Sequence, residues 1–292
     1  MTKCAFVLIG WAAGVTAAAA QPAPLDQLLE RTGRYARGFQ HDFETVIADE
    51  TYVQRERITR IQGGKPRVTS SVRTINSEMA FMWLPEDRSW LLVRNVRKVD
   101  NKEVRDSRAR LERVIADAAP GGLVPRFRRL RDESARFNLG RIQRNLNDPM
   151  LPFQFVDPAY QPRFTFELAG QEVINGVATS KVAFVEKTTP TVVAVDGHDS
   201  LSKGEIWLTA SGIVLRTHLT IENPLTSLSS SFVVTFGRAA TFAGWFPVRM
   251  DETYTQRPPA GSIDGLSTEI TCSATYWNFR RFETSARVVN PR

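Results

Sequence analysis

The feature that most constrains the fold is a repeated alternation of apolar and polar residues, interrupted by turn-forming residues about every 8–15 positions. From residue 163 onward this alternation continues to the C-terminal region. Phe164, Phe166 and Leu168 alternate with polar neighbours, which is typical of a half-buried strand. Asn175-Gly176 and Ala210–Gly212 are tight-turn sequences between such segments. The second half of the chain is therefore predicted to consist of strands joined by hairpins.

The first half contains strands as well, separated from the others by helical sequence. The ranges Thr51–Ile61 and Arg67–Leu84 are rich in Val, Ile and Thr, and Gly63-Gly64 between them predicts a hairpin turn. Ser89–Val99 follows as a further strand. About ten or eleven strands result, with no alternation of strands and helices of the parallel type. The fold class predicted is α+β, with a large antiparallel sheet.

Two blocks have helical spacing. Apolar residues recur at steps of three and four from Leu25 to Ile47, which predicts an N-terminal helix that ends before Ala48. Residues 106–148 form a second helical block, predicted as helices over Ser107–Ala119 and Val124–Leu146. This block interrupts the strands, so we interpret it as a helical insertion. Residues 21–292 contain no linker-like segment and are predicted to be one domain.

The composition is that of an ordinary globular protein, with 42% hydrophobic and 24% charged residues. These values exclude a disordered chain, a collagen and a polytopic membrane protein. The formal net charge of +7 is unevenly distributed. The stretch from Arg94 to Arg144 holds 15 basic and seven acidic residues, a net of +8. The excess positive charge is therefore concentrated at the helical insertion.

Residues 1–20 have the pattern of a secretory signal peptide. Lys3 supplies the basic start, Ala5–Val15 the apolar run, and Ala18-Ala19-Ala20 a small-residue cleavage site. An uncleaved anchor is the alternative, but the apolar run is short for a bilayer span. We therefore expect an exported protein, located in the periplasm or cell envelope. The remaining cysteine, Cys272, is predicted to be a buried apolar residue of a strand.

No catalytic or metal-binding signature occurs in the sequence. The three histidines, His41, His198 and His218, lack the spacing of a zinc site, and no nucleophile elbow, P-loop or dinucleotide-binding motif is found. The nearest carboxylate pairs, such as Asp132 and Glu133, are better interpreted as local charge pairing. We expect a protein that is not an enzyme and that binds no metal or cofactor.

Two short passages carry a resemblance to a known fold. They are Gly170–Gly176 continuing through Phe184, and Gly204-Glu205-Ile206-Trp207-Leu208 continuing through Gly212 to Leu215-Arg216. Together with the order of elements, they resemble the periplasmic lipoprotein-carrier (LolA-like) half-barrel superfamily and uncharacterised exported bacterial proteins. The resemblance implies a curved, unclosed antiparallel barrel in which helices form a lid over an apolar cavity.

The first functional hypothesis is that this cavity holds a hydrophobic ligand, such as a lipid or a lipoprotein acyl chain. Aromatic residues in the predicted strands would line it. The candidates are Phe81, Trp83, Trp90, Phe166, Phe184, Trp207 and Trp245.

The second hypothesis is an envelope protein–protein interaction module with a filled core. It would use the basic helical insertion to contact an acidic partner, and an anionic membrane surface is a further candidate for that contact. The candidate residues are Arg126, Arg128, Arg129 and Arg131. A solvated surface is the plainest interpretation of these arginines, and nucleic acid is not expected for an exported protein. A void between sheet and helices would favour the first hypothesis, and a packed interior the second.

Overall fold

The computed structural model describes most of the chain after the predicted signal peptide, whose residues 1–20 lie outside the described set. The described residues are 24–42, 45–84, 89–105, 107, 111, 113–114, 123–142, 144, 147–195, 197–223, 227–239, 242, 244–258 and 265–281.

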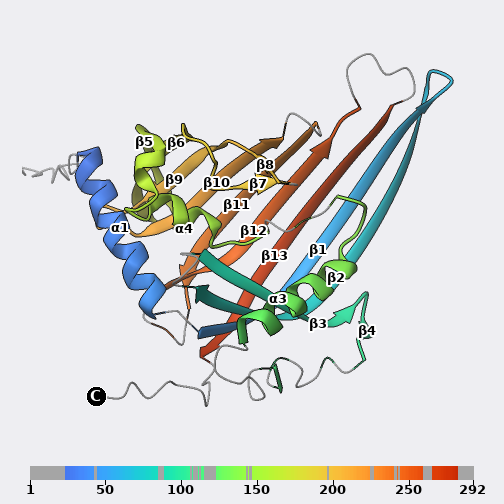
Figure 1. Cartoon of the computed structure of the whole chain (residues 1–292), viewed down its shortest axis with the longest axis horizontal. Helices are drawn as coiled ribbons and strands as arrows, with labels where there is room; N and C mark the ends of the chain where they lie inside the picture. Colours follow the sequence, from blue (N-terminus) through green and yellow to red (C-terminus); the bar gives the residue numbers. More distant parts are fainter. Residues whose placement is uncertain are drawn as a thin grey trace, which may run out of the picture.

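One large antiparallel sheet dominates the structure (Figure 1). Its eleven strands lie in the order β4-β3-β2-β1-β13-β12-β11-β10-β9-β6-β5, so β4 and β5 form its two edges and the sheet does not close. The strands are β1 (Thr45–Gln62), β2 (Lys65–Leu84), β3 (Ser89–Val99), β4 (Lys102–Glu103), β5 (Phe164–Ile174), β6 (Val177–Glu186), β9 (Ser202–Leu208), β10 (Val214–Asn223), β11 (Leu228–Arg238), β12 (Trp245–Gln256) and β13 (Leu266–Arg281). A separate two-stranded ribbon contains β7 (Ala194–Val195) and β8 (His198–Asp199).

The predicted turns are confirmed. Gly63 and Gly64 join β1 to β2 with φ angles of 58° and 74°, in the left-handed region that glycine adopts without strain. Asn175-Gly176 joins β5 to β6 with φ angles of 50° and 79°. These tight connections pair consecutive strands antiparallel, which confirms the predicted fold class of an unclosed antiparallel sheet with an N-terminal helix and a helical insertion.

Helices cover both faces of the sheet. They are α1 (Leu25–Asp42), α3 (Leu123–Ser134) and α4 (Leu151–Val156), with short 3-10 turns η1 (Ala135–Phe137) and η2 (Gln161–Arg163). None of the helices in the described ranges is long and apolar enough to cross a membrane.

We call the face that α1 and α4 cover the inner face. Phe39 of α1 and Phe153 of α4 belong to the same buried cluster as Phe81, Phe184 and Ile206 of the strands. Alternate strand residues face the other way, because successive side chains of a strand point to opposite sides. The main core of the molecule therefore lies between the inner face and these two helices.

Helix α3 covers the opposite, outer face. Its Phe127 and Leu130 are buried against Leu91 and Val93 of β3, in a cluster separate from the main core. Farther along the chain, Leu139 already contacts Gln54 of the inner face. The helical insertion thus passes around the β3 side of the sheet, with α3 on one face and α4 on the other.

Two helix boundaries differ from the sequence prediction. The helix predicted over Val124–Leu146 ends at Ser134, and the chain is extended at Asn138 and left-handed at Gly140. The N-terminal helix ends before Ala48 as predicted, but it does so at Asp42, so Val46 and Ile47, which belong to the predicted helical series, lie in β1 instead. Those two consecutive residues are buried on opposite faces, a pattern that imitates helical spacing when both faces of a strand are covered. Of the predicted helix over residues 107–119, the structure describes Ser107, Leu111, Arg113 and Val114, the last three as helical.

Candidate functional site: an arginine-lined cleft on a filled inner face

Aromatic side chains fill the inner face. Phe153 of α4 lies 5.0 Å from Phe39 and 5.4 Å from Phe236, measured between ring centroids. Two residues later, on the other side of α4, Phe155 lies 4.9 Å from Phe164. These separations are those of packed aromatic pairs, and Phe153 and Phe155 are almost entirely buried. The short helix α4 is therefore a plug in the main core.

Five of the seven aromatic residues predicted to line a cavity belong to this core. Trp83 and Trp90 are 5.4 Å apart, and Phe81 lies in the same cluster. Phe166 and Phe184 gather around Phe164 near the other end of the sheet, at 6.1 and 5.9 Å from it. The structure thus brings them together as two groups, with the residues of α4 between them.

The other two predicted residues lie elsewhere. Trp207 packs on the outer face with Ile174 and Leu215, and its indole N–H donates to a carboxylate oxygen of Glu172 at 2.7 Å. Trp245 is partly buried at the boundary between this outer cluster and the main core. Both faces of β9 carry apolar side chains, since Ile206 and Leu208 pack in the main core and Trp207 packs in the outer cluster.

Little empty space remains on the inner face. One space, lined by Trp90, Phe81 and Phe246 among others, measures about 10 Å³. A second, which we call the cleft, measures about 80 Å³. Pockets for small molecules usually measure about 300–1,000 Å³.

A groove of about 880 Å³ lies at the ends of β6, β9, β10 and β11 and is lined from both faces of the sheet. Val185, Lys203 and Glu222 belong to the outer face, whereas Ser202, Asn223 and Leu228 belong to the inner face. A further groove of about 460 Å³, lined by residues such as Arg136 and Arg141, opens beside the cleft. The described inner face is therefore packed around its aromatic side chains, and the larger grooves lie outside this aromatic core.

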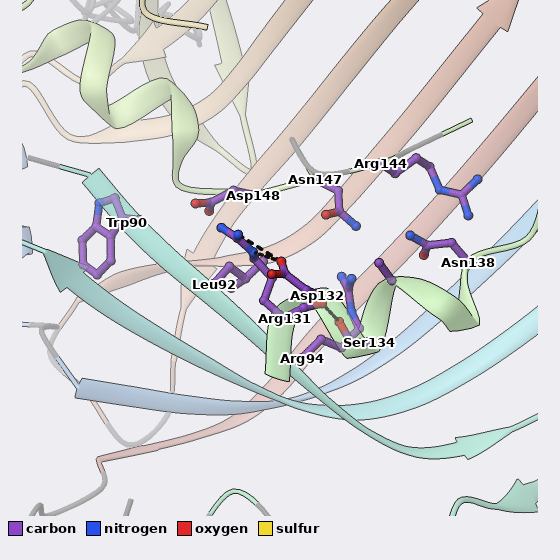
Figure 2. A pocket seen from close by; sticks show the side chains of 11 residues that line it. Trp90, Leu92, Arg94, Arg131, Asp132, Ser134, Asn138, Arg144, Asn147 and Asp148 are labelled. Atoms are coloured by element: carbon purple, nitrogen blue, oxygen red, sulfur yellow. Dashed lines mark hydrogen bonds and ion pairs between the residues drawn. The ribbon is translucent and has the colours of Figure 1, made fainter. Parts of the chain in front are cut away.

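The cleft lies between β3 and the segment that follows α3 (Figure 2). Its floor is apolar and its rim is charged. It is lined by Trp90, Leu92, Arg94, Arg131, Asp132, Ser134, Ala135, Asn138, Arg144, Asn147 and Asp148. A volume of about 80 Å³ accommodates a few water molecules or a group the size of a carboxylate or phosphate.

Arg94 anchors the cleft to the sheet. Its guanidinium donates to both oxygens of Glu50, at 2.7 and 2.8 Å, and Ser77 donates to the same carboxylate at 2.8 Å. Burial opposes the charge of Arg94, but Glu50 outweighs that effect and raises the arginine pKa. The pair is a bidentate, buried ion pair whose two charges balance each other.

Arg144 is buried with neutral partners. Its guanidinium donates to the amide oxygen of Gln54 at 2.5 Å and to the carbonyl of Leu139 at 2.8 Å. Its Nε finds no hydrogen-bond partner, and among the described residues it forms no ion pair within 4.0 Å. A guanidinium cannot release its proton, so burial without a nearby carboxylate is costly. Arg144 is thus the charge at the cleft that is compensated least.

A carboxyl group lies deeper in the same network. Glu252 accepts hydrogen bonds from Tyr52 at 3.2 Å and from Tyr254 at 2.5 Å. Burial raises the pKa of Glu252, although both hydroxyls and the two nearby arginines, Arg94 and Arg144, counteract this. A carboxyl with a raised pKa compensates the arginine charges less completely.

Asp148 is the titrating group at the cleft rim. Burial raises its pKa from the ordinary 3.8 to about 7, and the backbone N–H of Met150, which donates to the carboxylate at 2.8 Å, counteracts this only in part. A carboxyl group near neutrality can serve an acid or base catalyst. Asp148 therefore changes the charge of the cleft as the pH passes through neutrality.

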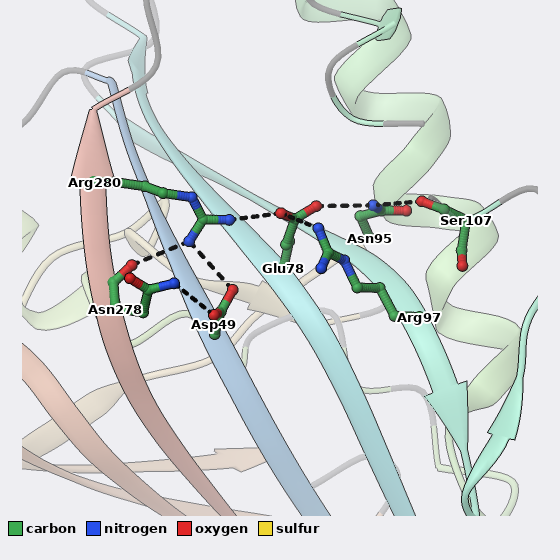
Figure 3. Close-up of polar contacts among 7 residues, drawn as sticks. All are labelled: Asp49, Glu78, Asn95, Arg97, Ser107, Asn278 and Arg280. Atoms are coloured by element: carbon green, nitrogen blue, oxygen red, sulfur yellow. Dashed lines mark hydrogen bonds and ion pairs between the residues drawn. The ribbon is translucent and has the colours of Figure 1, made fainter. Parts of the chain in front are cut away.

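A second polar cluster, on the outer face, is structural (Figure 3). Arg280 of β13 contacts Asp49 of β1 at 3.2 Å and Glu78 of β2 at 2.6 Å. Asn95 of β3 donates to Glu78 at 3.3 Å, and Arg97 pairs with the same carboxylate. These contacts tie four neighbouring strands together, and each carboxylate in the cluster has a cationic partner.

The four arginines proposed for partner contact lie on α3 with exposed side chains. Arg126 and Arg129 point away from the buried side that carries Phe127 and Leu130. Arg131 pairs with Asp132 at 3.0 Å at the cleft rim. The structure therefore presents a basic helix surface next to the cleft.

The expectation for Cys272 is confirmed, and the structure shows the surroundings of His218. Cys272 is buried on the inner face, and burial raises its pKa to about 12, which makes it an inert thiol. His218 is half-buried and lies 2.7 Å from Glu205 and 3.1 Å from Ser231. Within the described ranges no group of three or more His, Cys, Asp and Glu residues is arranged to hold a metal ion.

The buried polar network was missed by sequence reasoning. The clue is present in β1, where Glu50 and Gln54 occupy the same alternating positions as Val46, Ala48 and Tyr52. A charged residue at an inward position signals a buried partner. Arg94, which pairs with Glu50, lies on β3, so the spacing of residues along β1 does not reveal the pair.

Similarity to known proteins is found among solved structures. No protein-family model and no curated protein sequence matches the chain. Among solved structures, a putative outer membrane lipoprotein-sorting protein domain from Vibrio parahaemolyticus aligns over 88% of this chain and 92% of its own, with 9% identity and a TM-score of 0.30. A DUF1329 family protein from Desulfovibrio piger aligns over 88% and 93%, with 14% identity and a TM-score of 0.28. Lipovitellin, in a structure of lipid–protein interactions, aligns over 83% of this chain and 26% of its own, with 8% identity and a TM-score of 0.31.

The superpositions are too loose to support a conclusion about ligand or partner. Function is therefore inferred from the contacts of this chain.

Proposed function

We propose that the chain is an exported, non-enzymatic binding module with a filled core, which recognises an acidic protein partner of the cell envelope. The observation that carries this proposal is the packing of the inner face. The two spaces bordered by its aromatic residues measure about 80 and 10 Å³, far below the size of an acyl-chain cavity.

The positive charge of α3 indicates which surface would contact the partner. α3 is fixed to the outer face by Phe127 and Leu130, so its arginines are presented on a rigid element. A cluster of exposed arginines favours an acidic surface as partner and speeds the encounter with it. The residues assigned to this contact are Arg126, Arg128, Arg129 and Arg131.

Charge reversal on α3 tests the assignment. We expect Arg126→Glu/Arg129→Glu to lose a partner that the wild-type protein captures from envelope extract. Both side chains are exposed, so stability should change by less than about 0.5 kcal/mol. Arg37→Glu/Lys187→Glu, which reverses two exposed charges away from α3, is the matched control. Equal capture by both variants would contradict the proposal.

A second candidate function is binding of a hydrophobic ligand with an anionic head group. It is favoured by one observation: Trp90 borders both the arginine-lined cleft and the small apolar space that contains Phe81. The cleft would hold the head group. The hydrocarbon tail would enter beside Trp90 and displace the plug formed by α4.

A fluorescent fatty acid distinguishes the two functions. The second candidate requires saturable uptake that Trp90→Ala weakens and Trp207→Ala leaves unchanged, since Trp207 lies on the outer face. The filled-core proposal expects no saturable uptake by the wild-type protein.

A further inference from the structure

The ends of β1 and β2 project beyond the core (Figure 1). These strands have 18 and 20 residues, against an average of about 5–6 for strands in globular proteins. Every residue from Ile61 to Val72 is exposed. We call residues 55–73 the arm. A hairpin exposed on both faces gains little from burial, so core packing does not explain the length of the arm.

The arm has a free edge. β3 pairs with β2 only from Leu84 to Ile75, while β13 covers the other side of β1 as far as Arg60. Between Lys65 and Arg73, β1 is the only neighbour of β2 among the described strands. Pro66 offers no N–H, so the usable edge runs from Arg67 to Arg73.

The arm is strongly basic. It carries six cationic residues and one acidic residue, Glu56, a net of +5. The cations are Arg55, Arg57, Arg60, Lys65, Arg67 and Arg73. Within the described part of the chain, Arg73 has an ion-pair partner and the other five have none. Such a surface complements an acidic segment and repels a second copy of itself.

The two sides of the free edge differ in character. Strand register places Arg67 and Arg73 on the inner side, and it places Val68 and Val72 on the outer side, where they are 49% and 61% exposed. A strand added to this edge would meet cations on one side and valines on the other. Its best sequence alternates acidic and apolar residues.

We propose that the free edge of β2 binds an extended segment of a partner protein in which acidic and apolar residues alternate, adding a strand to the sheet. This inference rests on the proposed function, binding of an acidic protein, and assigns a second contact surface to it. Backbone hydrogen bonds would supply affinity, and the two rows of side chains would fix the register.

A synthetic peptide tests the proposal. The probe is a fluorescein-labelled peptide of about nine residues, alternating glutamate and valine, with both ends blocked. Fluorescence anisotropy should show saturable binding to the full-length protein. Lys65→Glu/Arg67→Glu should weaken that binding by about tenfold or more, because two attractive contacts become repulsive.

Two controls separate this inference from the proposed function. A peptide of the same composition with its glutamates grouped together should bind at least about tenfold more weakly, since it cannot match both sides of the edge. The α3 variant Arg126→Glu/Arg129→Glu should bind the alternating peptide within about twofold of the wild type. Absence of binding, or binding insensitive to the arm variant, would overturn the inference while leaving partner capture through α3 intact.

Discussion

Glu50 and Arg94 show how a buried ion pair constrains a single residue. The arginine is 7% exposed and the glutamate 1%, and two hydrogen bonds join them. Glu50→Leu would leave a guanidinium buried without a counter-charge. We expect it to lower the free energy of unfolding by about 3–5 kcal/mol, measured by urea denaturation.

The double variant Glu50→Leu/Arg94→Met is the control. Replacing both partners of a buried pair by apolar residues is often nearly neutral, so we expect it to recover most of the loss. If the double variant is as unstable as the single one, the pair is not what holds this part of the inner face.

Asp148 predicts a dependence of stability on pH. Its folded pKa of about 7 lies above the ordinary value of 3.8. Between pH 4 and 7 the folded carboxyl keeps a proton that the unfolded chain releases, so the free energy of unfolding falls as the pH rises through this window. Asp148 keeps some exposure, so we expect Asp148→Asn to remove about 1–2 kcal/mol of that fall.

Urea denaturation of wild type and Asp148→Asn at pH 5 and pH 8 measures this effect. The asparagine still accepts from Met150, so the comparison isolates the charge. A stability difference between the two proteins that is the same at both pH values would contradict a raised pKa.

At the scale of elements, Gly140 is the position at which the chain after α3 adopts a left-handed turn close to the sheet. Its φ of +81° is a left-handed conformation, and an added Cβ would overlap a carboxylate oxygen of Glu56 and lie 3.0 Å from Ile270. The chain turns here to lie close against β1 and β13. A continuous helix would carry this segment past the sheet.

Gly140→Ala should therefore lower the free energy of unfolding by more than an alanine at a positive φ does elsewhere, because the side chains of Glu56 and Ile270 would have to move. We expect a loss of about 2 kcal/mol, against about 1 kcal/mol for Gly176→Ala. Gly176 has nearly the same φ, +79°, and nothing within 4 Å of the added Cβ. Equal losses in thermal or chemical denaturation would show that the close approach of Gly140 contributes nothing.

The sequence predicted the strands better than the insertion, for a physical reason. Alternation and turn residues such as Asn175-Gly176 are local signals, and they specify hairpins whose partners are adjacent in the chain. The path of the chain after α3 brings Gly140 close to Glu56 and Ile270, residues far away in sequence, and no local signal encodes that approach.

The candidate site was predicted only in part for the same reason. Trp90 was identified because aromatic residues in strands are conspicuous. The pairing of Arg94 with Glu50 and the isolation of Arg144 depend on contacts across strands and loops. The arginines of α3 were located correctly on an exposed helix, since their spacing against Phe127 and Leu130 is local.

At the scale of the whole molecule, the packed core and the exposed positive charge lie in different parts of the fold. α1 and α4 fill the inner face, and the outer polar cluster ties the neighbouring strands. The exposed positive charge lies outside this core, on the arm and on α3. A filled interior and a basic exterior are the arrangement expected of a module that binds another protein.

Native mass spectrometry of the protein purified from its own envelope tests the filled core most directly. The account predicts the mass of the polypeptide with no bound lipid, and the mass would also show whether residues 1–20 have been removed. A retained adduct of lipid mass, displaced by added fatty acid and lost in Trp90→Ala, would contradict the filled core and establish a ligand cavity in its place.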